Sequence, residues 1–364
     1  MNMKQGRYII TNTNYKVFEP SKLPVEIDLL KISKELELAN RAIGALNFLD
    51  IVLPNYELLV EPYITKEALL SSEIEGTQST LSAVLNENKE VSDNIDIREV
   101  QNYKKALNYA LNSELPLCNR LLKETHKVLM LNVRGGESHK TPGEFRTSQN
   151  WIGGTSPSNS IYNPPTPENM IECMSDLEKY INSDDSLPSL VQTALIHYQF
   201  ETIHPFLDGN GRIGRILITL FLSKNKILKQ PNLFLSLYLK ENKEQYYNLL
   251  TKIRETGNYE NWLIFFLNGI INISERMQKT SNKIIELKEK FKKETRDKYN
   301  FVDFIFKKPT FIINDIIKEM QVNYNIADYI AKDFEKKNII KEITNYKRNK
   351  RYCFVDYLKI LEEI

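Results

Sequence analysis

The sequence predicts a mainly α-helical protein with one hairpin-like insertion and a small C-terminal winged helix-turn-helix domain. Apolar residues recur at intervals of three and four through most of the chain, the period of a helix that buries one face. The glycines concentrate around 135–154 and 209–214, where the backbone must turn sharply or approach another group closely. The pattern of the tail, 301–364, differs from the helical pattern and from the glycine-rich stretches, and it predicts a separate unit.

Composition and charge exclude several classes of protein. Hydrophobic residues make up 41% of the chain, enough for a sizeable core, and a net charge of +2 gives no overall attraction to nucleic acid or membrane. The start of the chain lacks the apolar stretch of a signal peptide, and runs such as 216–222 are too short to span a bilayer. Three cysteines without a close pair argue against a disulfide framework. We therefore expect a cytoplasmic protein with no membrane partner.

Helices are predicted wherever the apolar period continues for three turns or more. A longer helix over 259–293, rich in Lys and Glu toward its end, is predicted to lead into the tail. The shorter helices are predicted at 32–49, 64–85, 97–112, 121–131, 167–181, 187–202 and 214–224.

The segment 141–167 interrupts the helical pattern. Strand-like residues at 145–152 are followed by Gly153 and Gly154 and by a proline-rich return. This order predicts a hairpin or flap. A plain connecting loop satisfies the local pattern equally well.

The tail, 301–364, shows helical segments at 312–320 and 325–337 and then strand-like pieces at 339–343 and 351–355. This order is typical of a winged helix-turn-helix. Seven basic residues against one acidic residue lie between 336 and 351, which favours contact with DNA phosphates. The whole tail carries 12 basic and 10 acidic residues, however, so docking to a protein stays open as well.

Residues 204–215 carry the strongest indication of chemistry. Gly209, Gly211 and Gly214 satisfy the spacing of a dinucleotide fingerprint, but a helical segment precedes them and no acidic residue follows until Glu241. A P-loop is excluded because no Gly-Lys-Ser/Thr closes the loop. The segment is therefore predicted to be a glycine-containing loop between two helices.

Such a loop can hold phosphates. Gly209 and Gly211 let backbone N–H groups face inward at a helix N-terminus, which is an anion site. Arg212 and Arg215 are three residues apart on one helical face and supply forked donors for phosphate.

Two further side chains complete the predicted chemistry. Asp208 precedes the glycines and is placed to hold Mg²⁺ against the phosphates. His204 lies one turn earlier, where a neutral imidazole can accept the proton of an attacking hydroxyl.

The string from His204 to Arg215 resembles the active-site motif of the Fic family, His-x-Phe-x-Asp/Glu-Gly-Asn-Gly-Arg-x-x-Arg, at every defined position. The resemblance implies a Fic-type helical core in which His204 is the general base, Asp208 binds Mg²⁺, and AMP moves from ATP to a protein hydroxyl. Gly211 stands where the related Doc kinases carry Lys, which favours nucleotidyl transfer. The residues implied to bind the ATP phosphates are Gly209, Asn210, Gly211, Arg212, Ile213, Gly214 and Arg215.

The resemblance extends to the insertion and to a pair of tyrosines. It implies that the insertion aligns the target chain, with Ile152, Gly153, Gly154 and Thr155 nearest the ATP. Tyr246 and Tyr247 fall where relatives place a tyrosine pair near the nucleotide base. Two core aromatics in a helix explain that pair equally well.

Ser71-Ser72-Glu73-Ile74-Glu75-Gly76 resembles the inhibitory motif Ser/Thr-x-x-x-Glu-Gly/Asn found ahead of the core in one class of the family. The resemblance implies that Glu75 pairs with Arg215, the side chain meant for the γ-phosphate, with Ser71 on the same helical face and Gly76 after it. A solvated helix face is the plain alternative. The same carboxylate could orient water for removal of AMP.

The expected organisation has four parts. These are a helical region (1–100) with an inhibitory helix near 65–76, the catalytic core (101–275), a linking helix (276–300) and the winged-helix domain (301–364). The expected function is an ATP- and Mg²⁺-dependent protein adenylyltransferase that modifies Ser, Thr or Tyr of unknown proteins including itself. The alternative is a DNA-binding regulator that uses the core as a nucleotide sensor. Relatives self-associate, so a homodimer is a further expectation.

Overall fold

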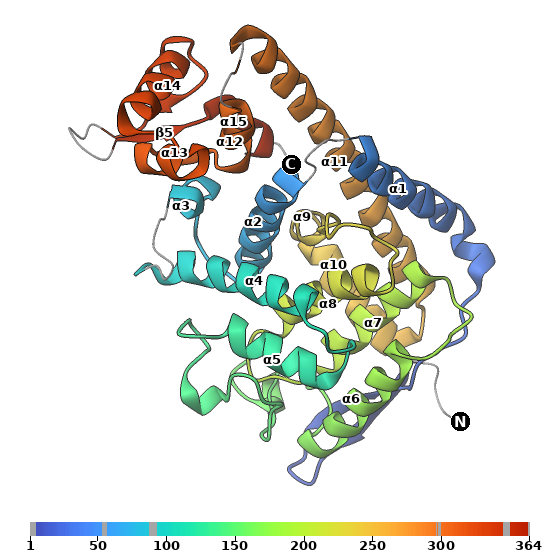
Figure 1. The fold of residues 1–364 in the computed structure, drawn as a ribbon. Helices are drawn as coiled ribbons and strands as arrows, with labels where there is room; N and C mark the ends of the chain where they lie inside the picture. Colours follow the sequence, from blue (N-terminus) through green and yellow to red (C-terminus); the bar gives the residue numbers. More distant parts are fainter. Residues whose placement is uncertain are drawn as a thin grey trace.

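The structure is a computed structural model that describes residues 5–52, 57–86, 93–295, 297, 300–344 and 350–362. It is mainly helical, as the apolar period predicts (Figure 1). The helices up to the tail are α1 (Ser33–Val52), α2 (Glu57–Ile74), α3 (Leu81–Asn86), α4 (Ile95–Asn112), α5 (Asn119–Leu129), α6 (Pro167–Ile181), α7 (Ser189–Ile203), α8 (Asn210–Lys224), α9 (Ser236–Glu241), α10 (Lys243–Thr256) and α11 (Glu260–Thr295).

Helices α7 and α8 form the centre of the molecule. They pack against each other, and α7 is buried on nearly every side, including polar residues such as Thr193, His197 and Gln199. Helices α4 and α5 pack as a pair beside them, and α1 lies along α11 (Figure 1). The loop 204–209, which joins α7 to α8, therefore starts and ends on rigid elements.

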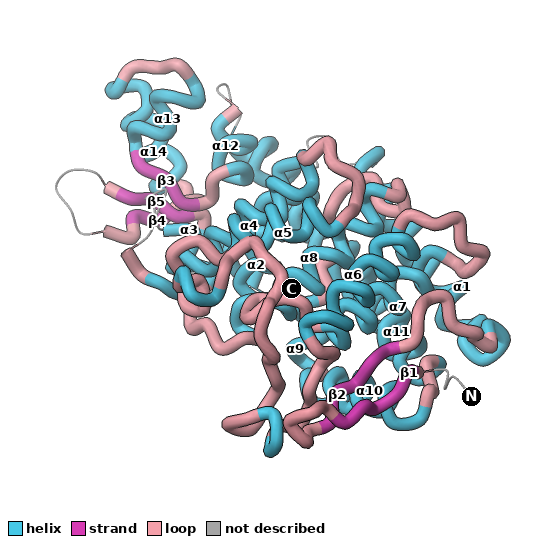
Figure 2. The backbone as a smooth tube through the Cα atoms, turned by 90° about the horizontal axis from the view of Figure 1, so that it is seen from below, coloured by secondary structure: helices cyan, strands magenta, loops and turns pink. Residues whose placement is uncertain are grey.

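The N-terminal region, expected to be helical over 1–100, contains a β-hairpin ahead of its helices, and the sequence analysis did not predict this hairpin. Strands β1 (Gly6–Ile10) and β2 (Lys16–Pro20) pair antiparallel with Tyr8 opposite Phe18 (Figure 2). The turn between them closes where the Thr11 amide donates to the Tyr15 carbonyl. Short strands do not follow the three- and four-residue period of a helix, so a reading based on that period does not detect them.

The helix predicted over 64–85 is divided in two. Helix α2 ends at Ile74, and α3 begins at Leu81. Gly76 lies between them with φ +99°, a backbone conformation that a side chain would strain. Glu75 is therefore in the turn that follows the helix and not on its face.

The insertion 141–167 is an irregular loop with a single bridge, between Ile152 and Tyr162. The strand predicted over 145–152 does not form because two of its side chains bond to backbone carbonyls. Arg146 donates to the carbonyls of His204 and Pro165. Asn150 donates to the carbonyl of Phe206 at 2.8 Å. These bonds hold the base of the insertion to the α7–α8 loop.

The return of the insertion also lies along the N-terminal hairpin. The Phe18 amide donates to the carbonyl of Asn163 at 3.0 Å, and the Asn163 side chain donates to the carbonyl of Lys16 at 2.8 Å. Because Ile152 bonds to Tyr162 next to this point, β1, β2 and the two arms of the insertion run side by side.

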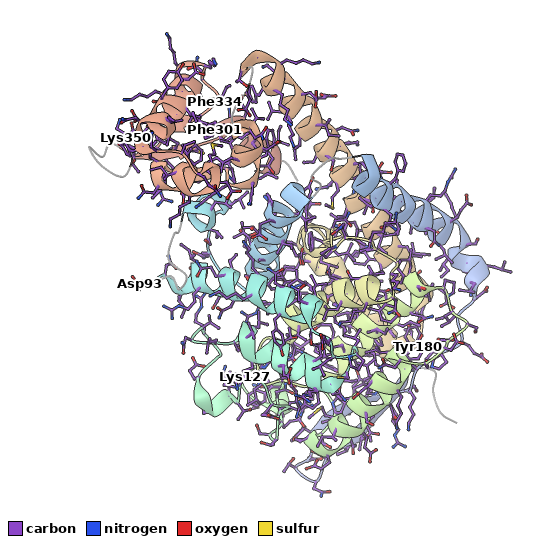
Figure 3. The ribbon with its side chains drawn as sticks, in the orientation of Figure 1. Asp93, Lys127, Tyr180, Phe301, Phe334 and Lys350 are labelled. Carbon is purple, nitrogen blue, oxygen red and sulfur yellow. The ribbon has the colours of Figure 1, made fainter. Side chains whose placement is uncertain are left out.

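The tail forms a compact C-terminal unit whose central helices match the prediction. Helices α13 (Ile313–Met320) and α14 (Tyr324–Lys336) lie against a sheet of order β3-β5-β4 (Figure 1). Phe301 and Phe334 meet edge-on in its core, 4.6 Å between ring centroids (Figure 3). Residues 345–349 of the predicted basic segment lie outside the described residues. The remaining elements of the unit are α12 (Phe301–Lys307), β3 (Thr310–Ile312), β4 (Lys341–Glu342), β5 (Arg351–Cys353) and α15 (Val355–Glu362).

The C-terminal unit packs against α2 and α3, the helices that precede and follow the turn containing Glu75. Helices α12 and α15 contact α2, and β3 contacts α3 (Figure 1). Helix α11 reaches this unit without a break, and the boundary predicted at 275/276 falls inside it. No helix among the described residues has both the length and the apolar character needed to cross a membrane.

Candidate active site at the α7–α8 loop

His204 ends helix α7 in a left-handed conformation, with φ 51°. A residue other than glycine adopts this conformation only where its surroundings hold it there. The His204 amide donates to the carbonyl of Phe200 at 2.9 Å, and its own carbonyl accepts from Arg146 at 3.0 Å and from Asn150 at 3.3 Å. The strained position is therefore fixed by the base of the insertion.

The His204 ring is oriented as a base. Its Nδ1 donates to the carbonyl of Glu201 at 3.3 Å, because a carbonyl can only accept. The Nε2 atom consequently keeps its lone pair. Burial lowers the pKa of His204 to about 4, so the ring is neutral at physiological pH. These are the properties that the sequence analysis assigned to this residue.

The loop is closed by hydrogen bonds that involve Asn210. Its side-chain oxygen accepts from the Phe206 amide, and its side-chain nitrogen donates to the Phe206 carbonyl, both at 2.8 Å. Asn210 was predicted to help form the anion hole, and its buried side chain is used within the loop. Only its backbone N–H remains for an anion.

His126 of α5 supports the same loop and was missed by the sequence analysis. Its Nδ1 accepts from the Gly143 amide at 2.8 Å, so its Nε2 carries the proton and donates to the Asp208 carbonyl at 3.0 Å. Its ring stacks on Phe206 with 3.8 Å between centroids. Burial lowers the pKa of His126 to about 4, in agreement with a neutral ring.

The N-terminus of α8 presents backbone donors. Gly209 precedes the helix with φ +76°, and no side chain caps the first turn within the described part of the chain. The N–H groups of residues 210–212 therefore face the loop, as the first donors of a helix do. Ile213 and Gly214 were wrongly included as phosphate ligands. The Ile213 amide bonds to the Gly209 carbonyl and its side chain lies in the core, while Gly214 faces Glu201.

Asp208 lies between two cations. Its Oδ2 is 3.3 Å from Lys140 Nζ, and its Oδ1 is 3.7 Å from Arg212 Nη2. Lys140, like His126, was missed by the sequence analysis. Among the described residues no cluster of three or more His, Cys, Asp or Glu side chains could hold a metal by itself. A single carboxylate that already attracts a cation fits Mg²⁺ carried on phosphates, because Mg²⁺ usually takes one or two protein carboxylates and completes its shell with phosphate and water.

Arg215 lies in the second turn of α8 and is held by the end of α2. Its Nε donates to Ser71 Oγ at 2.7 Å, and its Nη2 donates to the Ser71 carbonyl at 2.9 Å and to Glu75 Oε1 at 2.7 Å. Only 3% of Arg215 is exposed. Ser71, Glu75 and Arg215 thus meet, although 140 residues separate the two charged partners.

The Glu75 carboxylate also occupies the space above the first turn of α8. A Cβ atom on Gly211 would lie 2.4 Å from Glu75 Oε1 and 3.0 Å from an Arg215 nitrogen. Glycine at 211 is therefore required for this close approach. The carboxylate thus lies beside Gly211 in the first turn of α8 and bonds to the Arg215 guanidinium.

The pKa shifts of Glu75 and Arg215 indicate a strong ion pair. Burial alone would raise the pKa of Glu75, but Arg215 lowers it below its usual range. Burial alone would lower the pKa of the Arg215 guanidinium, but Glu75 raises it above the usual value. Both side chains are consequently ionised at neutral pH.

The turn that carries Glu75 is fastened on both sides. Lys243 donates to the carbonyl of Ile74 at 2.7 Å, and Lys240 pairs with Glu73 at 2.7 Å. Thr77 donates to the buried carboxylate of Glu99 in α4. Two of these contacts come from α9 and α10, so the turn is tied to the segment that carries Tyr246 and Tyr247.

The two tyrosines differ from each other. Tyr246 is a core residue whose hydroxyl bonds to His197 at 2.9 Å, so the expectation that it lines a base pocket was wrong. Tyr247 is 43% exposed. Burial of the rest of the side chain raises the pKa of Tyr247 to about 12, and the charges of Glu75 and Arg215 also act on it, which places it near the site.

The predicted nucleotide-adjacent part of the insertion, 152–155, is exposed on the surface. Its position is set by Tyr162, which bonds to Ile152 and whose hydroxyl donates to the Thr202 carbonyl at 2.6 Å. The insertion is therefore tied to the last turn of α7, directly before His204.

Comparisons with known families agree with this geometry. The family model described as Fic/DOC family N-terminal matches residues 33–112, and the model described as Fic/DOC family matches 116–222. The two together cover about half of the chain and include α2, α7 and α8. The resemblance drawn from residues 204–215 is thereby confirmed.

Individual relatives give the same picture. The chain is 29% identical over 179 residues to the protein adenylyltransferase Fic of Drosophila grimshawi and to that of Drosophila mojavensis. These matches cover 49% of this chain and 33% and 32% of the relatives, so the chain spans about a third of their length. Among solved structures, a Fic family protein from Desulfovibrio desulfuricans aligns over 92% of this chain and 98% of its own, with a TM-score of 0.62 and 19% identity. A Fic domain containing signaling protein from Bacteroides thetaiotaomicron aligns over 68% and 97%, with a TM-score of 0.51 and 20% identity. Both likenesses show the fold.

Proposed function

Because the chain belongs to the Fic/DOC family, we propose that it is a protein adenylyltransferase that transfers AMP from ATP to a protein hydroxyl and is inhibited by its own Glu75. The matched relatives named as protein adenylyltransferases support the activity. The observation that carries the proposal is the Glu75 carboxylate itself, which lies beside Gly211 in the first turn of α8 and pairs with Arg215, within electrostatic range of the neutral His204.

The proposed reaction uses this chain's groups in three ways. The Nε2 atom of His204 takes the proton from a Ser, Thr or Tyr hydroxyl. The hydroxyl oxygen attacks the α-phosphorus, the bond from that phosphorus to the bridging oxygen breaks, and pyrophosphate leaves. The backbone N–H groups of residues 210–212 and the guanidinium groups of Arg212 and Arg215 hold the phosphate oxygens.

We assign Asp208 as the protein ligand of Mg²⁺. When bound, Mg²⁺ supplies positive charge that neutralises the triphosphate. Lys140 currently contacts the Asp208 carboxylate, so it must move or share this carboxylate when the metal–nucleotide complex enters.

Inhibition follows from competition for one guanidinium. With Glu75 on Arg215, the γ-phosphate cannot use that side chain, and the α-phosphate is not aligned for attack. A buried charge-assisted bond of 2.7 Å is strong enough to compete with a phosphate. The same carboxylate is placed to orient a water, so removal of AMP is proposed as the reverse activity of the inhibited state.

The test compares self-modification in three proteins incubated with α-labelled ATP and Mg²⁺. These are the natural chain, the variant Glu75→Gly (called the released variant from here on) and the released variant with His204→Ala. We expect more label on the released variant than on the natural chain, and none when His204 is also replaced. Absence of label from all three, with ATP binding intact, would contradict the proposed activity.

The C-terminal unit is proposed to be a winged helix-turn-helix that docks proteins. Its order of helices and strands supports the assignment. DNA is less favoured, because lysines of this unit pair with its own carboxylates, as in the pairs of Lys332 with Asp328, Lys337 with Asp333 and Lys350 with Glu342. A cytoplasmic location remains our expectation from the sequence.

A further inference from the structure

Glu201 is a partly buried acidic residue that the proposed mechanism does not use. It lies in the last turn of α7, and its backbone carbonyl accepts the bond from His204 Nδ1. Its side-chain Oε1 is shielded from solvent and has no hydrogen-bond partner among the residues that the structure describes. A buried carboxyl oxygen without a partner is unfavourable and calls for an explanation.

The Glu201 side chain lies against the same helix face as Glu75. A Cβ atom on Gly214 would be 2.1 Å from Glu201 Oε1, and one on Gly211 would be 2.4 Å from Glu75 Oε1. Residues three apart are neighbours on one face of a helix. The two carboxyl groups therefore rest on successive turns of α8, and both lie within electrostatic range of Arg215.

The other titratable groups around Glu201 stay in one state near neutral pH. His197, whose Cε1 would be 3.3 Å from a Cβ on Gly214, bonds through both nitrogens, and burial lowers its pKa to about 3. His204 is neutral as described, and burial raises the pKa of Tyr246 well above its usual value. Glu75 and Arg215 are both charged.

The charge of this cluster depends on what binds Arg215. With Glu75 or a phosphate paired to Arg215, a second carboxylate would leave an uncompensated negative charge in a buried place. With Arg215 unpaired, an ionised Glu201 would neutralise it. Burial is the main reason that the pKa of Glu201 is raised to about 7; Arg215 lowers it and Glu75 raises it. While Arg215 is paired, the charges of this cluster therefore balance when Glu201 carries a proton.

We propose that Glu201 is a positioning residue whose protonation depends on Arg215. Glu201 holds a proton while Arg215 is paired with an anion. When Arg215 is free, Glu201 gives up that proton and becomes the counter-ion that keeps the guanidinium in place. The inference rests on the proposed function, because the second anion is a phosphate of ATP. It follows that ATP binding to a chain without Glu75 takes up a proton.

Calorimetric titration of ATP and Mg²⁺ tests this directly. The released variant is compared with the released variant carrying Glu201→Gln, from pH 6.5 to 8.5 and in two buffers of different ionisation enthalpy. Gln is the isostere of protonated Glu, and the titration of ATP itself is common to both proteins. We expect the affinity of the released variant to fall at least threefold over this range with net proton uptake, and both effects to shrink in the Gln variant.

Two further proteins separate this linkage from general damage. Glu201→Asp in the released variant keeps the carboxyl group and should keep the dependence on pH. Glu172→Gln, on the exposed side of α6, removes a surface carboxyl group and should change nothing. Equal dependence on pH with and without the Glu201 carboxyl, with ATP still bound, overturns the role of Glu201 alone. Absence of ATP binding from every variant overturns the proposed function, and this inference with it.

Discussion

The released variant should be less stable than the natural chain without nucleotide and should respond more strongly to ATP. Arg215 is 3% exposed, and among the described residues Glu75 is the carboxylate that forms an ion pair with it. Removing one member of a buried ion pair typically costs about 3–5 kcal/mol, because the other charge is left uncompensated. Arg215 keeps two bonds to Ser71, Glu201 is proposed to become its counter-ion, and 36% of the Glu75 side chain is exposed, so the expected loss falls to about 2 kcal/mol.

This loss converts into a measurable shift of the melting temperature. At about 2.1 cal/mol/K per residue, the unfolding entropy of 364 residues is about 0.76 kcal/mol/K, so about 2 kcal/mol lowers Tm by about 3 °C. ATP at a hundred times its Kd restores about 2.7 kcal/mol, or about 3.5 °C. The natural chain should gain less from the same ATP concentration, because the γ-phosphate cannot use Arg215 while Glu75 is paired with it.

Calorimetric unfolding with and without ATP and Mg²⁺ gives both quantities. Glu75→Gln is the matched control, since it keeps the size and one acceptor oxygen but removes the charge, and it should melt between the other two proteins. A released variant that melts at or above the temperature of the natural chain, with no larger gain from ATP, would refute the idea that Glu75 compensates Arg215.

Three more changes should act on separate parts of the site. At saturating ATP, kcat of the released variant should fall only below about pH 6.5, the ordinary pKa of histidine. Burial lowers the pKa of His204 to about 4, so the ring stays neutral above that pH. A midpoint above about pH 6.5 in the pH profile of kcat would contradict this. Gly211→Ala in the released variant should weaken ATP binding about tenfold or more, because the added methyl group would lie 3.0 Å from an Arg215 nitrogen, in the space that Glu75 occupies in the natural chain; unchanged affinity in a titration would show that phosphate does not lie there. Lys140→Met should lower several-fold the Mg²⁺ concentration that half-saturates ATP binding, because it removes the cation 3.3 Å from Asp208; an unchanged or higher Mg²⁺ requirement would separate Lys140 from the metal site.

The parts of the site that could be predicted lie in continuous stretches of sequence. Residues 204–215 form one loop and one helical turn, so their spacing already fixes their arrangement. The contact of Glu75 with Arg215 spans 140 residues and was expected only through the resemblance to a family motif. The turn that places Glu75 beyond the end of α2 depends on Gly76, whose role appears only in the backbone conformation.

The residues that escaped prediction act through burial and distant contacts. His126 is a single histidine in a helical pattern, and nothing in its neighbours indicates a bond to the Asp208 carbonyl. Arg146 lies in a stretch that looks like a strand, yet its guanidinium bonds to the His204 and Pro165 carbonyls. Nothing in the sequence around Glu201 indicates its position; its contact with Gly214 is known only from the structure. The paired β-strands near the start were missed because each is only five residues long.

The continuity between the N-terminal hairpin and the insertion has a practical consequence for anyone shortening this protein. A fragment that starts after Pro20 would retain the whole stretch from His204 to Arg215 and both family matches. It would nevertheless lose the neighbour to which Asn163 is bonded, on the side of the site where an incoming polypeptide is expected to align. Such a fragment should therefore handle nucleotide normally while presenting its protein substrate poorly, and tests of target choice belong on a chain that keeps the N-terminal hairpin.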